Sequence, residues 1–241
     1  MSGLTNLTYL HLGSNFINDV SPLSNLANLE VLNVSLNTEL SDISPLSELV
    51  NLTSLNLVYT AVSDIAPLSG LVNLTHLDLH FNDIRDIAPL SELTQLSELR
   101  IGRNNIRDIS PLSNLVNLNY LDLSGGCPYC CGFESIIDDY TPISKLSSLR
   151  VLDLSERQLC DIGFLSSLTS LEHLNLGFNQ VTDIAPLSDL TNLTSLNLES
   201  NQIIDISPLS GLSNLDFLYI QDNPISDWSQ VEHIGEVIGR S

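Results

Sequence analysis

The chain has few basic residues, no long apolar run and no arrangement typical of an enzyme active site. Only 8 of its 241 residues are Lys or Arg, against 29 Asp and Glu, which gives a formal net charge of −21. Nucleic acids and anionic membrane surfaces are bound by basic side chains, so this balance argues against both as partners. No apolar run approaches the roughly 20 residues of a membrane-spanning helix, and we expect neither membrane insertion nor a cleavable signal peptide. The sequence offers no Ser/His/Asp set, carboxylate pair or phosphate-binding loop, which favours a protein that is not an enzyme and needs no cofactor.

What the sequence does have is a repeat, almost always of 22 residues. The segment from Leu4 reads LTNLTYLHLGSNFINDVSPLSN, and the segment from Leu190 reads LTNLTSLNLESNQIIDISPLSG. The same frame begins again at Leu26, Leu49, Leu71, Leu93, Leu115, Leu146, Leu168 and Leu212. Such a period predicts a solenoid, in which each repeat buries its apolar face against its neighbours.

Most positions of the repeat carry a structural expectation. Positions 6 to 10 alternate outward and inward and predict a short strand, so stacked copies should form a parallel sheet. Leu, Ile or Val at positions 1, 4, 7, 9, 14, 17 and 20 should fill the interior. The Asn at position 12 and the Asp at position 16 should bond backbone groups of turns, and Pro at position 19 suits the first turn of a short helix. The position-16 Asp occurs in all ten copies, so much of the negative charge has a structural role.

The pattern L-x-x-L-x-x-L-x-L-x-x-N-x-I-x-D-I-x-P-L-x-x resembles leucine-rich repeats, most closely the 22-residue class of internalin-like bacterial surface proteins. This resemblance implies a curved stack of about ten coils, with a parallel β-sheet on the concave side and 3-10 helices or turns on the convex side. We expect the array over residues 1–227, with a loop insertion at about 126–136 in the sixth repeat. A capping helix should follow over residues 228–241, where Trp228, Val231, Ile234 and Val237 have helical spacing. The helical N-terminal cap that is usual in internalin-like proteins is not expected here.

Side chains at positions 6, 8, 10 and 11 should stand on the outer face of the sheet. Aromatic and histidine residues at exposed positions that need no such side chain are typical of a recognition surface. They are densest in the third to sixth repeats, and seven of the eight basic residues lie between Arg85 and Arg157. The candidate partner-binding residues are Tyr59, His76, Asp78, His80, Phe81, Glu98, Arg100, Arg103, Tyr120 and Asp122. The alternative is that cross-strand pairs among these residues only stabilise the sheet.

Two features within this set suggest a more specific chemistry. Arg100 should lie between Asp78 and Asp122 in adjacent strands, either as a member of a charge ladder or as a ligand-binding arginine. His76, Asp78 and His80 could approach a metal ion, with Glu98 as a further ligand, but a flat wet face provides no second shell. We therefore expect an exposed polar row and no metal site on this face.

Four cysteines lie within 34 residues of a chain that has no others: Cys127, Cys130, Cys131 and Cys160. Three hypotheses remain open, namely a disulfide that pins the inserted loop, zinc binding by the four thiols, and free thiols. Cys127-Pro-Tyr-Cys130 also matches the glutaredoxin active-site motif, but the thioredoxin-like fold which that chemistry requires is not indicated here.

The resemblance implies a non-catalytic protein-binding module of a bacterial secreted or cell-surface protein, which recognises its partner through the concave face. The partner would be a protein or a surface glycan, and the chain itself would be monomeric. The alternative is a cytoplasmic leucine-rich-repeat scaffold or regulatory subunit that holds an enzyme.

Overall fold

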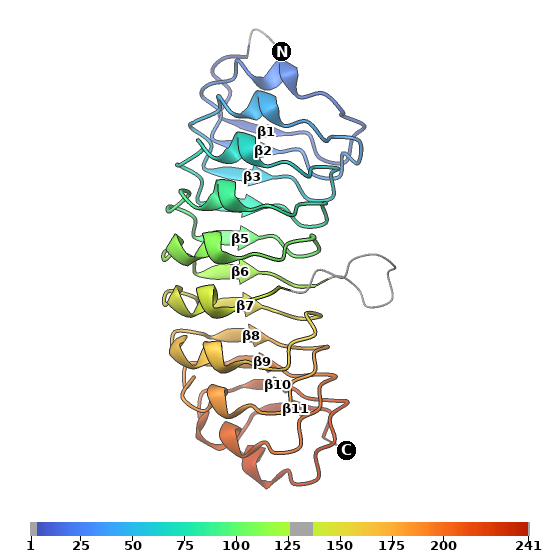
Figure 1. Cartoon of the computed structure of the whole chain (residues 1–241), viewed down its shortest axis with the longest axis vertical. Helices are drawn as coiled ribbons and strands as arrows, with labels where there is room; N and C mark the ends of the chain where they lie inside the picture. Colours follow the sequence, from blue (N-terminus) through green and yellow to red (C-terminus); the bar gives the residue numbers. More distant parts are fainter. Residues whose placement is uncertain (1–3, 126–136, 241) are drawn as a thin grey trace.

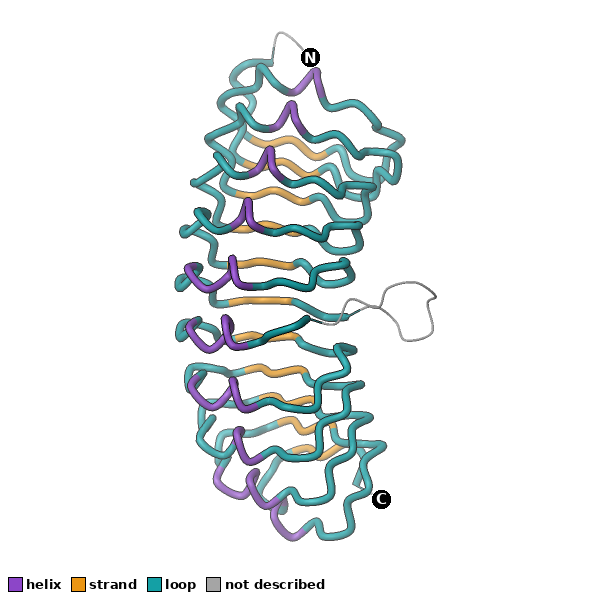
Figure 2. Tube along the Cα trace, viewed as in Figure 1, coloured by secondary structure: helices purple, strands orange, loops and turns teal. Residues whose placement is uncertain are grey.

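The computed structural model describes residues 4–125 and 137–240. Over these residues the chain winds into a stack of similar coils, each with a short strand on one side and a 3-10 helix on the opposite side (Figure 1, Figure 2). Eleven strands within the described residues form one parallel sheet in the order of the sequence. They are β1 (Tyr9–His11), β2 (Val31–Asn33), β3 (Ser54–Asn56), β4 (His76–Asp78), β5 (Glu98–Arg100), β6 (Tyr120–Asp122), β7 (Val151–Asp153), β8 (His173–Asn175), β9 (Ser195–Asn197), β10 (Phe217–Tyr219) and β11 (Glu236–Ile238). The predicted solenoid with a parallel sheet is therefore confirmed.

Neighbouring strands pair position for position, because each coil repeats the one before it. Leu55, Leu77 and Leu99 at position 7 lie opposite one another in β3, β4 and β5 and are at most 1% exposed. The buried leucines, isoleucines and valines form one hydrophobic core along the stack. Burying a leucine side chain stabilises a protein by roughly 1.5–3 kcal/mol. Because successive coils bury their leucines against one another, this apolar contact holds the stack together.

The position-16 aspartates lead into the helices, as the sequence predicts. The carboxylate accepts the N–H of the first helical residue, from Ser21 to Asp19 and from Ser207 to Asp205, both at 2.8 Å. These hydrogen bonds lower the pKa of the two carboxyls below 3.8. The helices are η1 (Ser21–Leu23), η2 (Ser44–Leu46), η3 (Ala66–Leu68), η4 (Ala88–Leu90), η5 (Ser110–Asn114), η6 (Thr141–Lys145), η7 (Gly163–Ser167), η8 (Ala185–Leu187), η9 (Ser207–Gly211) and η10 (Ser229–Val231).

The position-12 asparagines form the expected ladder between coils. Asn104 is 2% exposed, and its Nδ2 donates to the carbonyl of Leu79 in the preceding coil (2.9 Å) and to that of Ile101 in its own coil (3.0 Å). Its Oδ1 accepts the N–H of Ile84 (3.0 Å). Each buried backbone group left without a partner would cost about 1–3 kcal/mol, so the ladder closes the turns that follow the strands.

A second asparagine ladder, which we did not predict, runs along position 3. Asn28 Nδ2 donates to the carbonyl of Thr5 (2.8 Å), and Asn73 Nδ2 donates to that of Val50 (2.9 Å). Both acceptors belong to the preceding coil. This recurring Asn therefore links successive coils at the start of each repeat.

The coil that follows the insertion has Arg157 where the ladder asparagine would be. Arg157 is 4% exposed; its backbone N–H donates to Asn179 Oδ1 (3.0 Å), and its Nε donates to the carbonyl of Leu123 in the preceding coil. Leu123 occupies the same repeat position as Leu79, the acceptor of Asn104. Arg157 thus makes the contact to the preceding coil that an asparagine makes elsewhere, and burial lowers the pKa of its guanidinium.

The expectation of a capping helix over residues 228–241 was wrong for the described part of the tail. It contains the three-residue helix η10 and then β11, which pairs with β10 through Phe217 and Glu236. Val231 and Ile234 join the core. Apolar residues three apart also mark positions 1, 4 and 7 of the repeat, so the spacing that resembles a helix belongs to a further coil.

Candidate binding surface

The outward side chains of the strands and of the two turn positions that follow them make up what we call the sheet face. All ten predicted binding residues lie on it, in four neighbouring coils that the register of β3 to β6 brings together. His76 and Asp78 belong to β4, and Glu98 and Arg100 to β5. The others are Tyr120 and Asp122 in β6, and Tyr59, His80, Phe81 and Arg103 in the turns. The structure brings these side chains together, as the register of the repeats predicts. Their role in binding stays a prediction.

A row of large side chains at position 11 forms one edge of the sheet face, and we call it the ridge: Leu36, Tyr59, Phe81 and Arg103. Leu36, Tyr59 and Phe81 are 47%, 51% and 49% exposed. The Tyr59 and Phe81 rings meet edge to face with centroids 6.0 Å apart, and the Arg103 guanidinium lies 5.9 Å from the Phe81 ring centre. Contiguous exposed apolar side chains of this kind are typical of interaction sites.

The backbone at the ridge is left-handed, which makes its bulky side chains costly. The φ angles of Leu36, Tyr59, Phe81 and Arg103 lie between 53° and 58°. This conformation costs most L-residues roughly 1–2 kcal/mol, a penalty that Gly avoids and Asn or Asp reduces. Stability therefore does not explain Leu36, Tyr59 and Phe81 at this position, because their side chains are also about half exposed. Arg103 differs from them, since its Nη2 donates to Glu156 Oε1 (2.5 Å) and its side chain is only 25% exposed. Local rules broken in this way are expected at functional sites.

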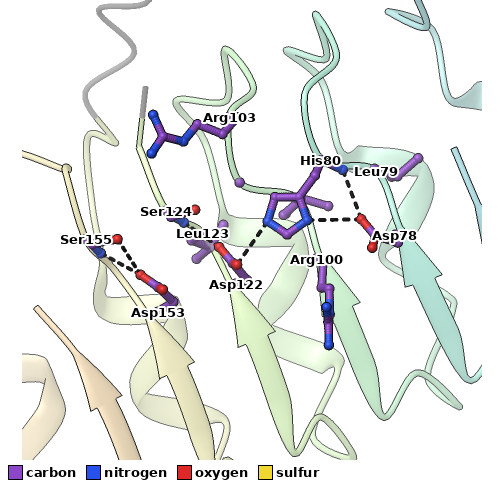
Figure 3. A network of polar contacts seen from close by, with 12 residues as sticks. Asp78, Leu79, His80, Arg100, Arg103, Asp122, Leu123, Ser124, Asp153 and Ser155 are labelled. Atoms are coloured by element: carbon purple, nitrogen blue, oxygen red, sulfur yellow. Dashed lines mark hydrogen bonds and ion pairs between the residues drawn. The ribbon is translucent and has the colours of Figure 1, made fainter. Parts of the chain in front are cut away.

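A charged cluster lies beside the ridge and spans three strands (Figure 3). His80 Nδ1 is 3.0 Å from Asp78 Oδ1, and His80 Nε2 is 2.9 Å from Asp122 Oδ2. Burial lowers the pKa of His80, but the hydrogen bonds and charges of Asp122 and Asp78 outweigh it and raise this pKa to about 9. Burial raises the pKa of Asp122, but the hydrogen bond and charge of His80 bring it below 3.8. The imidazole is thus an imidazolium at neutral pH, with both N–H groups directed at carboxylates.

Gly102 makes this cluster possible. It lies in the coil between His80 and Asp122, and a Cβ there would lie 2.9 Å from His80 Nε2 and 2.8 Å from Asp122 Oδ1. It would also lie 2.4 Å from Ser124 Oγ. Because glycine leaves this space open, the imidazole can cross over one coil and reach the next.

Arg100 does not have the partners that the sequence suggested. It lies opposite Asp78 and Asp122 in the sheet, as expected, but His80 binds both carboxylates. The Arg100 Nε instead lies 2.8 Å from Glu98 Oε1, in an ion pair without hydrogen-bond geometry. The guanidinium carbon lies 4.5 Å from the centre of the Tyr120 ring, and the side chain remains 37% exposed. The hypothesis of a charge ladder between Arg100 and the two aspartates is therefore wrong.

Position 8 has a structural function that the sequence analysis missed. In most coils its Asn or Asp Oδ1 accepts the N–H two residues later, as from Val58 to Asn56 (3.0 Å) and from Ser155 to Asp153 (2.8 Å). Asp78 and Asp122 accept His80 and Ser124 N–H groups in the same way. The Arg100 side chain has no acceptor atom, so its coil lacks this hydrogen bond. The recurrence of Asn and Asp at the last residue of the strands, just before a turn, was the available signal.

The possible metal ligands are already engaged by the protein. Both ring nitrogens of His80 face carboxylates, and His76 Nδ1 lies 2.9 Å from the Thr75 hydroxyl. No group of three or more His, Cys, Asp or Glu side chains in the described part of the chain could hold a metal ion. Of the four cysteines, Cys127, Cys130 and Cys131 lie outside the described residues, as does the predicted insertion at 126–136. Cys160 is described and exposed.

Comparison with known proteins identifies the repeat. The family described as leucine rich repeats (2 copies) matches residues 5–48, 50–92, 147–190, 169–211 and 191–233. No curated protein matches the chain significantly.

Solved structures of bacterial proteins are similar to between 79% and 98% of this chain. An internalin (InlF) from Listeria monocytogenes is 39% identical, with a TM-score of 0.87 over 96% of this chain and 66% of that one. The chain thus spans just under two thirds of that structure. Internalin C2 (InlC2) of the same organism is 36% identical, with a TM-score of 0.71 over 79% of this chain and 82% of that one. The functional domain of InlJ from Listeria monocytogenes is 22% identical, with a TM-score of 0.75 over 98% of this chain and 54% of that one, and shows the fold alone. The repeats and these similarities together show that the chain belongs to the leucine-rich repeat family and is internalin-like.

Proposed function

We propose that this chain is the non-catalytic recognition module of a bacterial secreted or cell-surface protein, and that it binds a protein partner through the sheet face. Leucine-rich repeats and the internalin-like structures support a protein-interaction module. The internalin similarity also supports the surface or secreted location. Among the described residues, no helix has both the length and the apolar character that crossing a membrane requires.

The observation that carries the proposal is the ridge. Tyr59 and Phe81 present half-exposed rings from left-handed backbone, where Gly would avoid the cost of the conformation and Asn or Asp would reduce it. Arg100 lies nearby at a position where Asn or Asp would add a hydrogen bond. A few residues carry most of the binding energy at protein interfaces, and Tyr, Trp and Arg are enriched among them. We infer that Tyr59, Phe81 and Arg100 form the centre of the contact and that Glu98, Arg103 and the His80 cluster form its polar surroundings.

Arg100 is prepared for such a contact because it is already held in place. Glu98 and the Tyr120 ring fix its guanidinium, so less side-chain freedom is lost on binding. The net charge of −21 disfavours nucleic acid, and we propose a protein partner engaged by a monomeric chain.

Site-specific photocrosslinking tests the location of the interface. A benzophenone amino acid replaces Phe81 on the ridge or, as the matched control, Phe16, which is 98% exposed beyond the turn after β1. The proposal expects covalent capture of one surface protein of the host or of a neighbouring cell from position 81 and none from position 16. Equal capture from both positions would contradict it.

The captured partner is then used for affinity measurements. Tyr59→Ala, Phe81→Ala and Arg100→Ala should each weaken binding by about 2 kcal/mol or more, as expected of central interface residues, while thermal stability stays nearly unchanged. A large loss of stability without a loss of affinity would show that these residues stabilise the sheet instead.

A further inference from the structure

The other half of the sheet face contains a shallow trough across β6 to β10. It has a volume of about 240 Å³, with Tyr120 at one end and Tyr219 at the other. Smaller side chains of β7, β8 and β9 form its floor, among them His173, Ser195 and Asn197. The two tyrosines are four strand steps apart in the sheet, which corresponds to about 19 Å at roughly 4.8 Å per step.

The floor offers hydrogen-bonding groups that the protein does not use. Within the described residues, the His173 ring, the Ser195 hydroxyl and the Asn197 Nδ2 have no hydrogen-bond partner, whereas Asn197 Oδ1 accepts the Glu199 N–H (2.9 Å). Gly177 adjoins this group, and a Cβ there would lie 3.1 Å from Asn197 Nδ2. The glycine therefore keeps the amide accessible beside the trough.

The one carboxylate of the floor is already satisfied by the protein. Asp153 Oδ1 accepts the Ser155 N–H (2.8 Å), and Asp153 Oδ2 accepts Asn175 Nδ2 (2.9 Å). What remains is a set of largely uncharged donors and acceptors between two aromatic rings. This lining differs from the ridge and from the cluster around His80, where apolar and ionic groups dominate.

Tyr219 has the same property as Arg100, since it breaks the position-8 pattern. It replaces the Asn or Asp whose side chain accepts the N–H two residues later in most coils. Its coil therefore gives up a stabilising hydrogen bond for an aromatic side chain that stands at the end of the trough. A function for this ring is the simplest physical account of that exchange.

From this lining we propose that the trough binds a neutral oligosaccharide along the stack. Sugar hydroxyls both donate and accept hydrogen bonds, as the groups of His173, Ser195 and Asn197 require, and the C–H faces of sugar rings pack on tyrosine rings. A peptide that binds by strand addition would need a free strand edge, but β7, β8 and β9 are paired on both sides. An acidic glycan would be repelled by the net charge of −21.

Calorimetric titration and saturation-transfer NMR with defined sugars test this proposal. The probes are cellohexaose, chitohexaose and mannohexaose, which represent polysaccharides, and an asialo biantennary N-glycan, which represents glycoproteins. Binding of any of them to the chain supports the proposal, and the one bound distinguishes the two sources. Absence of binding by all four overturns it, independently of whether the ridge binds a protein.

Two matched pairs of variants locate the site. Tyr219→Ala and Asn197→Asp should each lower the affinity at least about tenfold, and the aspartate keeps the acceptor for the Glu199 N–H while it removes the donor. Tyr9→Ala and Asn33→Asp are the controls, since they make the same changes in β1 and β2 and should leave affinity unaltered. Equal losses of affinity in the trough variants and in the controls would overturn the proposal. So would unchanged affinity in both trough variants.

Discussion

The His80 cluster makes the stability of this protein depend on pH between about 6.5 and 9. A histidine whose pKa is raised in the folded state stabilises that state fully below its unfolded pKa, and this contribution is lost as pH rises through the folded pKa. For His80 these values are 6.5 and about 9. At 1.36 kcal/mol per pKa unit, the difference corresponds to about 3.4 kcal/mol as an upper limit. The ring is partly solvated, so we expect about 1–2 kcal/mol.

The perturbation is His80→Gln, which keeps hydrogen-bonding groups near Asp78 and Asp122 but removes the titrating charge. Urea denaturation followed by circular dichroism gives the free energy of unfolding of both proteins at about pH 6 and about pH 10. The stability advantage of the wild type over His80→Gln should shrink by about 1–2 kcal/mol between these pH values. His76→Gln is the matched control, because the His76 side chain lies in the same coil and is 55% exposed. An advantage of the wild type over His80→Gln that is equal at both pH values would refute the reasoning.

Three further predictions concern single residues and are read from the same denaturation experiment. Gly102→Ala should lower the free energy of unfolding by about 1–3 kcal/mol, because its methyl group would overlap the His80 cluster. Gly70→Ala is the control: the space around its Cβ position is open, so it should lower this free energy less than Gly102→Ala does. At Phe178, whose φ is 58°, Phe178→Gly should be more stable than Phe178→Ala by roughly 1 kcal/mol, and the opposite order would contradict the cost assigned to the ridge. Asn104→Ala should cost about 2–4 kcal/mol, because it leaves several buried backbone groups unpaired, whereas Asn117→Ala removes one exposed hydrogen bond and should cost less than 1 kcal/mol or so.

Much of the candidate surface could be predicted from the sequence, because the repeat assigns every residue a place. Tyr59, Phe81 and Arg103 share position 11, so their alignment along one border follows from counting. The partners of the charged residues could not be predicted in this way. Asp78 and Asp122 lie opposite Arg100 as expected, yet they bind His80, because the absence of a side chain at Gly102 lets the imidazole reach both carboxylates.

The C-terminal tail shows the limit of spacing alone. Residues three apart fit both a helix and the leucine positions of the repeat, and only pairing of β11 with β10 distinguishes the two. The position-8 hydrogen bonds were missed for a related reason. Asn and Asp at an outward strand position are compatible with either ligand binding or turn formation. Which of the two applies depends on whether the backbone N–H two residues later points at the side-chain oxygen.

By itself, the sequence determined the solenoid, the register of its coils, the apolar interior and the asparagine and aspartate positions that satisfy the turns. These follow from local rules that each 22-residue unit repeats. The tertiary structure alone decided which outward side chains meet, which pair with one another and which remain available to a ligand. Such contacts involve three coils at once, and they depend on the space and the hydrogen-bonding groups that neighbouring coils leave free.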